Sequence, residues 1–156
     1  MSSDPNSTNA SPRQRKRASR PELFMHIAEL FGERSSCPRA DVGAVAVRDG
    51  RIVASGYVGA PSGQSHCYEV GCDIEMGHCV RTIHAEANLV AWSARVGTSL
   101  EGTTVYCTHS PCRRCAQLLL NAGISGYRFK HEYDDTWLWL RQSGVSVTRV
   151  GVGIIE

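Results

Sequence analysis

Apolar residues recur at helical spacing in the segment PELFMHIAELF, residues 21–31, after a stretch of 20 residues that shows no such period. Leu23 and Phe24 begin the apolar stripe of this segment. Pro21 suits the first turn of a helix, and Gly32 suits its end. The pattern predicts a helix over residues 21–31.

Two runs rich in valine and isoleucine follow, within VGAVAVRDGRIVASGY, residues 42–57. The dipeptide Asp49-Gly50 separates them, and this pair is a strong signal for a tight hairpin turn. The next segment, residues 59–79, is rich in glycine, cysteine and histidine and is too polar for a strand or a helix. We therefore expect an antiparallel strand pair followed by an irregular loop.

The second half of the chain alternates between helical and extended patterns. Helices are predicted at residues 85–96, 112–123 and 135–144, and strands at residues 103–108, 127–129 and 145–152. Helices that alternate with strands are typical of an α/β sandwich, and the opening hairpin adds an antiparallel pair. The expected fold is a three-layer α/β/α sandwich with a mixed five-stranded sheet.

The length of 156 residues suits one domain, which we place at residues 21–156 after a disordered basic tail at residues 1–20. No apolar run reaches the roughly 18 to 20 residues of a membrane span, and the start of the chain lacks the apolar centre of a secretory signal. We therefore expect a cytoplasmic protein, and we exclude a membrane protein, a secreted disulfide scaffold and a multidomain machine.

The formal net charge of +2 conceals an uneven distribution. Residues 1–20 contain five basic residues and one acidic residue, a net charge of +4, so the remaining 12 basic and 14 acidic residues carry −2. The basic cluster RQRKR can contact nucleic acid or a membrane surface, but its composition favours a solvated arm. Because the rest of the chain has no excess positive charge, we expect no membrane partner and no nucleic acid partner.

The chain contains seven cysteines, and their number is odd. In a reducing compartment such clusters indicate metal binding more often than disulfides. Cys107 lies in the middle of a predicted strand, where it is expected to be a small core residue. The other six cysteines are candidates for metal ligands.

Two short motifs each open a predicted helix. The first contains His84 and Glu86, and the second contains Cys112 and Cys115 three residues apart. Together they match the pattern H-x-E…P-C-x-x-C of zinc-dependent nucleobase deaminases. A lone C-x-x-C is also compatible with a structural zinc knuckle or a redox pair. The residue types, their order and their position at helix starts together favour a catalytic zinc site.

The chemistry of this motif follows from its ligand types. One imidazole and two thiolates leave the fourth tetrahedral position of Zn²⁺ open, as catalytic sites require. Zinc lowers the pKa of a bound water toward neutrality. Glu86, two residues after His84, is expected to take a proton from that water and return it to the substrate.

From Pro21 to Val150, the chain resembles the deoxycytidylate (dCMP) deaminases of bacteria and phages, within the cytidine deaminase superfamily. The likeness includes CPRADVGAVAVRDGRIVASGY, GAPSG, CVRTIHAEANLV, SLEGTTVYCTHSPCRRCAQLLLNAGI and a YDD element. It implies a cytidine deaminase-like fold and a zinc-dependent hydrolase that converts dCMP to dUMP and ammonia. It also implies a homo-oligomer, often a hexamer, with dCTP and dTTP as effectors, and Mg²⁺ only if such a triphosphate binds.

Carried over to this chain, the resemblance implies that His84, Cys112 and Cys115 hold zinc and that Glu86 is the proton shuttle. The backbone N–H of Ala85 would orient the pyrimidine carbonyl.

A second zinc site is expected around the Gly-rich segment. Four thiolates would form a closed structural site, and some phage members of the family carry a second zinc with cysteines at positions like Cys37 and Cys67. His66 or His78 could replace one of the later cysteines, and free thiols are the alternative. The proposed ligands are Cys37, Cys67, Cys72 and Cys79.

The segment Gly56-Tyr57-Val58-Gly59 departs from the family, which commonly has Gly-Tyr-Asn-Gly with an Asn that binds the sugar hydroxyl. Because valine forms no side-chain hydrogen bond, either a neighbouring polar group replaces the Asn or the substrate differs. A different substrate could be a modified pyrimidine nucleotide, another sugar, a nucleoside or a free base.

Further substrate contacts are expected from residues that border the motifs. Tyr57 could equally be a core aromatic residue and His109 a loop residue, and Arg113 and Arg114 either reach a phosphate or face solvent. The remaining substrate-binding candidates are Val58, Gly59, Ser110 and Tyr133.

Three functions are compatible with these motifs. The leading one is an enzyme that deaminates a free pyrimidine nucleotide. The second is a deaminase of tRNA or single-stranded DNA, which the basic tail favours and the acidic body opposes. The third is a non-catalytic zinc module, which the intact Glu86 opposes because a structural site needs no such carboxylate.

Overall fold

The computed structural model describes residues 17–151 and contains a mixed five-stranded sheet, as predicted. The strand order is β2-β1-β5-β6-β7. β1 pairs with β2 and β5 in antiparallel fashion, whereas β5, β6 and β7 run parallel. The strands are β1 (Gly43–Arg48), β2 (Arg51–Tyr57), β5 (Thr104–His109), β6 (Gly126–His131) and β7 (Ser146–Arg149).

The hairpin between β1 and β2 turns at the predicted dipeptide. Asp49 has φ 53° and Gly50 has φ 73°, so both turn residues adopt the left-handed conformation that a two-residue hairpin loop requires. Arg48 and Arg51 pair on either side of the turn.

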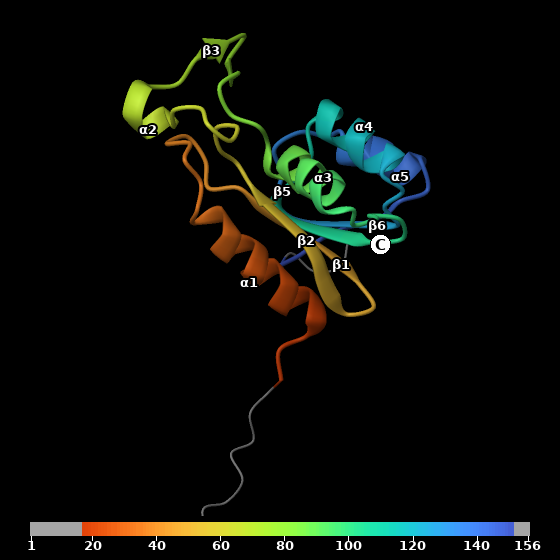
Figure 1. Ribbon diagram of the computed structural model, residues 1–156. Helices are drawn as coiled ribbons and strands as arrows, with labels where there is room; N and C mark the ends of the chain where they lie inside the picture. The colour runs from red at the N-terminus through yellow and green to blue at the C-terminus, as the bar shows by residue number, and fades with distance from the viewer. Residues whose placement is uncertain (1–16, 152–156) are drawn as a thin grey trace, which may run out of the picture.

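Helix α1 (Arg20–Gly32) covers one face of the sheet, as Figure 1 shows. It begins one residue before the prediction, because Ser19 and Glu22 form a reciprocal capping box. Phe24 packs against Tyr106 of β5 with ring centroids 5.3 Å apart.

Helices α3 (Ala85–Val96), α4 (Arg113–Asn121) and α5 (Trp137–Gln142) lie on the opposite face (Figure 1). Their buried residues Leu89, Leu119 and Leu140 belong to one core cluster with the strands. The predicted three-layer sandwich is therefore confirmed.

The close approach of α3 to β2 depends on a glycine. A Cβ atom at Gly56 would lie 2.3 Å from the carbonyl oxygen of Ala85 and 2.6 Å from the backbone nitrogen of Leu89. Any side chain here would push α3 away from the sheet. This contact fixes the position of the N-terminus of α3, where His84 and Glu86 lie.

The prediction of an irregular segment at residues 59–79 was wrong in part. The structure contains a short helix, α2 (Cys67–Val70), and a small antiparallel pair of β3 (Ile74–Glu75) and β4 (His78–Cys79). Local polar contacts stabilise these elements in place of an apolar stripe: the Glu69 carboxylate accepts a hydrogen bond from the His66 backbone N–H at 2.8 Å. In Figure 1, α2 and β3 extend away from the sandwich.

The predicted tail at residues 1–20 falls mainly on residues 1–16, which lie outside the described residues. Strand β7 ends at Arg149, before the predicted end at residue 152. Within residues 17–151, no helix is both long enough and apolar enough to cross a membrane.

Candidate active site

The first residues of two adjacent helices bring three metal-binding side chains together. His84 is the N-cap residue of α3, Cys112 is that of α4, and Cys115 lies in the first turn of α4. The His84 Nδ1 atom lies 3.4 Å from the Cys112 Sγ atom and 3.6 Å from the Cys115 Sγ atom. Neither N-cap side chain caps its helix, so both remain available to bind a ligand.

These distances fit a zinc ion. With Zn–S bonds of about 2.3 Å and Zn–N bonds of about 2.0–2.1 Å, tetrahedral geometry separates sulfur and nitrogen ligands by about 3.6 Å. The three donor atoms of His84, Cys112 and Cys115 meet this spacing. Their chemistry, one imidazole and two thiols, is that of a zinc site with one open position.

The protonation of the three donors favours one thiolate. The hydrogen bond from Cys115, together with His84, lowers the pKa of the Cys112 thiol to about 4 against the effect of burial. The same hydrogen bond and burial raise the pKa of the Cys115 thiol. The hydrogen bond with Cys112 raises the pKa of His84, although burial opposes this shift. A cation bound here would displace the remaining protons.

Glu86 lies beside these donors but is not one of them. Its side chain is only 3% exposed, and burial raises the pKa of its carboxyl group. Glu86 Oε1 accepts a hydrogen bond of 3.2 Å from the Tyr127 hydroxyl. A raised pKa makes a buried carboxyl group a better proton acceptor than an exposed one, which suits a general acid–base.

A cavity of about 400 Å³ lies next to Glu86 and the metal-binding side chains. Of the predicted site residues, His84, Ala85, Glu86 and Cys112 line it from the helix starts. The predicted substrate residues Val58, Ser110 and Tyr133 line it as well, as do His109, Cys37 and Cys79. The volume is that of a pocket for a small molecule.

Two predicted substrate residues are absent from the cavity wall, namely Tyr57 and Gly59. Both support the site through their backbone. The Tyr57 carbonyl accepts a hydrogen bond of 2.9 Å from the Asn88 side chain, and Gly59 pairs with Ile83, directly before His84. Their physical role in the structure is to hold the start of α3.

Val58 presents an apolar surface to the cavity. It is 6% exposed, and its backbone N–H donates to the Val42 carbonyl at 2.9 Å. The position where the family commonly has an amide side chain is therefore a part of the wall that forms no side-chain hydrogen bond.

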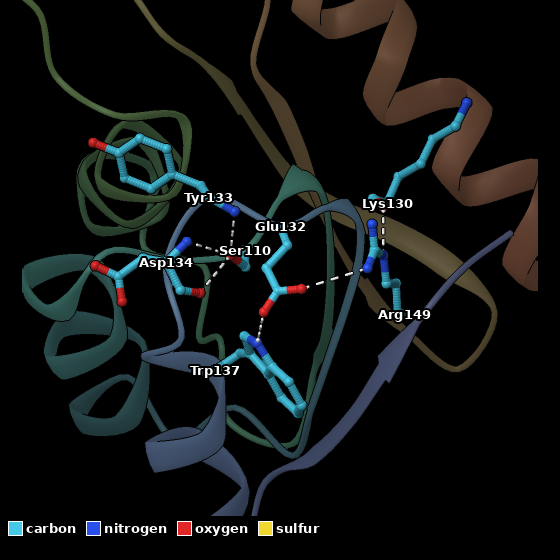
Figure 2. Close-up of polar contacts among 7 residues, drawn as sticks. All are labelled: Ser110, Lys130, Glu132, Tyr133, Asp134, Trp137 and Arg149. Carbon is cyan, nitrogen blue, oxygen red and sulfur yellow. Dashed lines mark hydrogen bonds and ion pairs between the residues drawn. The ribbon is translucent and has the colours of Figure 1, made fainter. Parts of the chain in front are cut away.

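Ser110 fixes the loop that follows β6, as Figure 2 shows. Its hydroxyl donates to the Asp134 carbonyl at 2.8 Å and accepts from the backbone N–H groups of Tyr133 and Asp134 at 2.8 and 3.1 Å. Because these contacts use its single proton and both lone pairs, Ser110 holds the backbone of Tyr133 and Asp134 in place.

Glu132 attaches the same loop to its neighbours (Figure 2). Its carboxylate accepts from Trp137 Nε1 at 3.0 Å and from Arg149 Nη1 at 3.4 Å.

Sequence reasoning missed the residues that form the outer rim of the cavity. Arg39 donates from Nη2 to the Gly77 carbonyl at 2.9 Å, and the Tyr133 hydroxyl lies 3.1 Å from His78 Nδ1. These pairs are 38 and 55 residues apart in the chain, so no local pattern signals them. Arg113 is outside the cavity wall and lies over the Trp139 ring at 5.3 Å.

A second cluster contains the sulfur atoms of Cys67, Cys72 and Cys79. The Sγ atoms of Cys67 and Cys79 lie 3.8 Å apart, and two sulfur ligands of a tetrahedral zinc ion are separated by about 3.8 Å. Cys37, the fourth predicted ligand, lies outside this cluster, although it is close enough to act electrostatically on Cys72. The ring of His78 is hydrogen-bonded to Tyr133.

The thiols of this second cluster also differ in acidity. Burial and the hydrogen bonds with Cys79 and Cys72 raise the pKa of Cys67 to about 12. For Cys79, burial is outweighed by the backbone N–H groups of Asp73 and Arg81, which lower the pKa to about 7. Cys107, in contrast, is fully buried in β5 as a core residue, as expected.

Comparison with known proteins identifies similar chains. Residues 18–130 match the family described as "Cytidine and deoxycytidylate deaminase zinc-binding region". The ComE operon protein 2 of Bacillus subtilis is 38% identical over 132 residues, which cover 83% of this chain and 70% of that protein. The deoxycytidylate deaminase of Enterobacteria phage T4 is 31% identical over a gapped alignment of 168 positions, which spans 81% of this chain and 87% of that protein.

The fold is similar to that of a solved relative. The crystal structure of dCMP deaminase from the cyanophage S-TIM5 in complex with dCMP and dUMP superposes with a TM-score of 0.76. The two chains are 34% identical, and the match covers 87% of this chain and 100% of the other. The predicted cytidine deaminase-like fold is therefore confirmed.

Proposed function

The chain belongs to the cytidine and deoxycytidylate deaminase family, and from this premise we propose that it hydrolyses dCMP to dUMP and ammonia. One observation carries the proposal. A buried carboxyl group, Glu86, lies beside three zinc-type donors at the cavity wall. A metal site that served only to stabilise the fold would need neither the carboxyl group nor the cavity.

The donor set of His84, Cys112 and Cys115 would hold zinc, which when bound supplies a water molecule of lowered pKa as the nucleophile. Glu86 accepts a proton from this water as the water oxygen bonds to C4 of the cytosine ring. Glu86 delivers this proton to N3. It then takes the second proton from the oxygen bonded to C4 and delivers it to the amino group. The C4–N4 bond breaks, ammonia leaves, and C4 becomes a carbonyl carbon.

The wall of the cavity would orient the pyrimidine. Ala85 lines the cavity and is the first residue of α3, where backbone N–H groups lack partners within the helix. Its N–H is the proposed donor to the pyrimidine carbonyl. Tyr133 lies on the loop that Ser110 holds and would cover the bound nucleotide.

Val58 favours a second candidate substrate for the same deamination reaction. Because the apolar wall at Val58 offers no hydrogen bond to a sugar hydroxyl, a modified cytosine nucleotide, a nucleoside or a free base is the alternative substrate. In support of dCMP, the S-TIM5 relative, with 34% identity, was crystallised with dCMP and dUMP.

We propose a second, structural zinc ion bound by Cys67, Cys72 and Cys79, with Cys37 as the fourth ligand. The sulfur spacing in the cluster supports it.

The family resemblance further supports a homo-oligomer, a hexamer, with dCTP and dTTP as effectors. Light scattering of the purified protein tests the oligomeric state, and the same measurement with dCTP·Mg²⁺ tests whether this triphosphate acts on the oligomer.

The experiment that tests the function is the loss of cytosine absorbance with zinc-loaded protein. The substrates are dCMP, CMP, deoxycytidine, cytosine and 5-substituted dCMP, each with and without dCTP·Mg²⁺. A strong preference for dCMP would support the proposal. If another cytosine compound is deaminated and dCMP is not, the alternative substrate is supported and Val58 is the residue that indicates the changed specificity. No turnover of any of them would contradict the proposal.

A further inference from the structure

Tyr127 is a buried tyrosine directly beneath the candidate active site. It lies on strand β6, between Val105 of β5 and Val147 of β7, and is 0% exposed. Nothing in the zinc motif includes it, and sequence reasoning assigned it only to a short strand. Its hydroxyl is nevertheless directed at the carboxyl group of Glu86.

The phenol hydroxyl has two oxygen acceptors within reach, and it also forms a hydrogen bond with the Cys107 thiol. The Glu86 Oε1 atom lies at 3.2 Å and the His109 carbonyl oxygen at 2.9 Å. A hydroxyl group has a single proton, so it can complete only one strong hydrogen bond at a time. The position of the phenol therefore links Glu86 at the start of α3 to the end of β5, where His109 borders the cavity.

Glu86 depends on this contact. Among residues 17–151, no other side chain donates a hydrogen bond to its carboxyl group, and the remaining contact is its own backbone N–H. A buried carboxylate with so few donors is costly, and the loss of one leaves it undersatisfied. A purely structural tyrosine would be satisfied by the His109 carbonyl alone and would not need to lie near Glu86.

The phenol also remains a donor under all ordinary conditions. Burial, with Cys107 and Glu86 beside it, raises the pKa of the Tyr127 hydroxyl well above its usual value. A raised pKa favours the protonated phenol, which is the form that donates a hydrogen bond.

We propose that Tyr127 is a positioning residue for Glu86, holding Oε1 so that the other carboxyl oxygen is left for proton transfer. The inference rests on the proposed function, because it assigns Glu86 the proton shuttle. It adds a residue that acts through Glu86 without touching substrate.

The test compares Tyr127→Phe with wild-type protein, both loaded with zinc. The matched control is Tyr106→Phe, which removes the same hydroxyl from a buried tyrosine on the α1 side of the sheet. We expect Tyr127→Phe to lower kcat at least about ten-fold with KM within about two-fold, and Tyr106→Phe to change neither. Zinc content should stay at the wild-type level in both.

A crystal structure of each zinc-loaded protein gives a readout that needs no turnover. In wild type we expect the Tyr127–Glu86 hydrogen bond to persist, and in Tyr127→Phe we expect the Glu86 side chain to leave its position or lose order. An unchanged, ordered Glu86 in the variant would overturn the inference. So would a wild-type structure in which the two oxygens lie beyond hydrogen-bond distance, and this check holds even if the variant does not fold.

The two proposals fail in different ways. If wild type deaminates none of the cytosine compounds, the proposed function fails, and the crystal structures still decide whether Tyr127 holds Glu86. If wild type is active and Tyr127→Phe keeps its kcat, the function stands and the positioning role is wrong.

Discussion

The two clusters of metal-binding side chains have similar donors but different surroundings. His84, Cys112 and Cys115 lie at the starts of α3 and α4, two helices that contribute Leu89 and Leu119 to the main core. The second cluster lies on α2 and the β3–β4 pair, which extend from the sandwich (Figure 1). There, several apolar side chains are largely exposed, including Tyr68, Val70, Ile74 and Met76.

This contrast indicates what each cluster does. The first is held in place by two helices that pack into the main core, so its geometry can serve chemistry at Glu86. The extending segment buries little apolar surface, so a metal bound there would supply much of its stability. The two clusters still meet at the cavity, because Cys79 and Cys112 both line it.

The sharpest test of the contrast is Glu86→Gln, which removes the proposed proton shuttle and leaves the donors intact. We expect turnover to fall at least about 10³-fold with unchanged zinc content, because the amide cannot transfer the proton. Steady-state kinetics and metal analysis measure both. Glu75→Gln, in the extending β3 strand, is the control and should behave like wild type. Near-normal turnover in Glu86→Gln would remove Glu86 from the mechanism.

Removing a donor from the first cluster should separate zinc loss from unfolding. In Cys112→Ala, we expect the loss of one zinc ion per chain and of all measurable turnover, while the circular dichroism spectrum stays native because the core supports both helices. Metal analysis of the dialysed protein checks this result. A full zinc complement in this variant would contradict the assignment of the ligand.

The equivalent change in the second cluster, Cys67→Ala, should have the opposite profile. We expect one zinc ion per chain to be lost and residues 67–80 to be cleaved faster by protease, with kcat largely retained. KM should rise several-fold, because Cys79 and His78 belong to the cavity wall. Unchanged zinc content would end the idea of a second site. Cys37→Ala, analysed in parallel, decides whether Cys37 is the fourth ligand.

A smaller effect is expected where the first cluster meets the loop after β6. Ser110→Ala leaves two loop N–H groups without their acceptor and should lower the free energy of unfolding by about 1–3 kcal/mol. KM should rise several-fold while kcat changes little, because Tyr133 moves and Glu86 does not. Chemical denaturation and kinetics measure the two effects, with the exposed-loop variant Ser99→Ala as control. A change confined to kcat would argue against a role in the loop.

The smallest expected effect is that of Val58→Asn in the cavity wall. If dCMP is the substrate, the amide adds a donor facing the sugar, and KM for dCMP should fall by about ten-fold or less. Zinc content should not change. A higher KM for dCMP, with faster turnover of another cytosine compound in wild type, would show that the apolar wall suits that other compound.

The sequence was most informative where function and local structure coincide. The helix starts at His84 and Cys112 were predictable because short motifs, glycine stops and apolar spacing are all local signals. The segment at residues 59–79 was partly mispredicted because its short elements depend on polar contacts and on cysteine clustering instead of an apolar period.

By itself, the sequence determined the order of helices and strands in the sandwich, the donor types of the first cluster and the carboxyl group beside it. Only the tertiary structure decided that Ser110 holds a loop and that Tyr57 and Gly59 lie outside the cavity wall. It also decided that the Tyr127 hydroxyl contacts Glu86, which is 41 residues away in the chain. The reason is physical, because residue types and short-range periodicity are local properties that can be identified in the sequence. Hydrogen bonds between distant segments exist only after the packing of α3 and α4 on the sheet has fixed where each side chain lies.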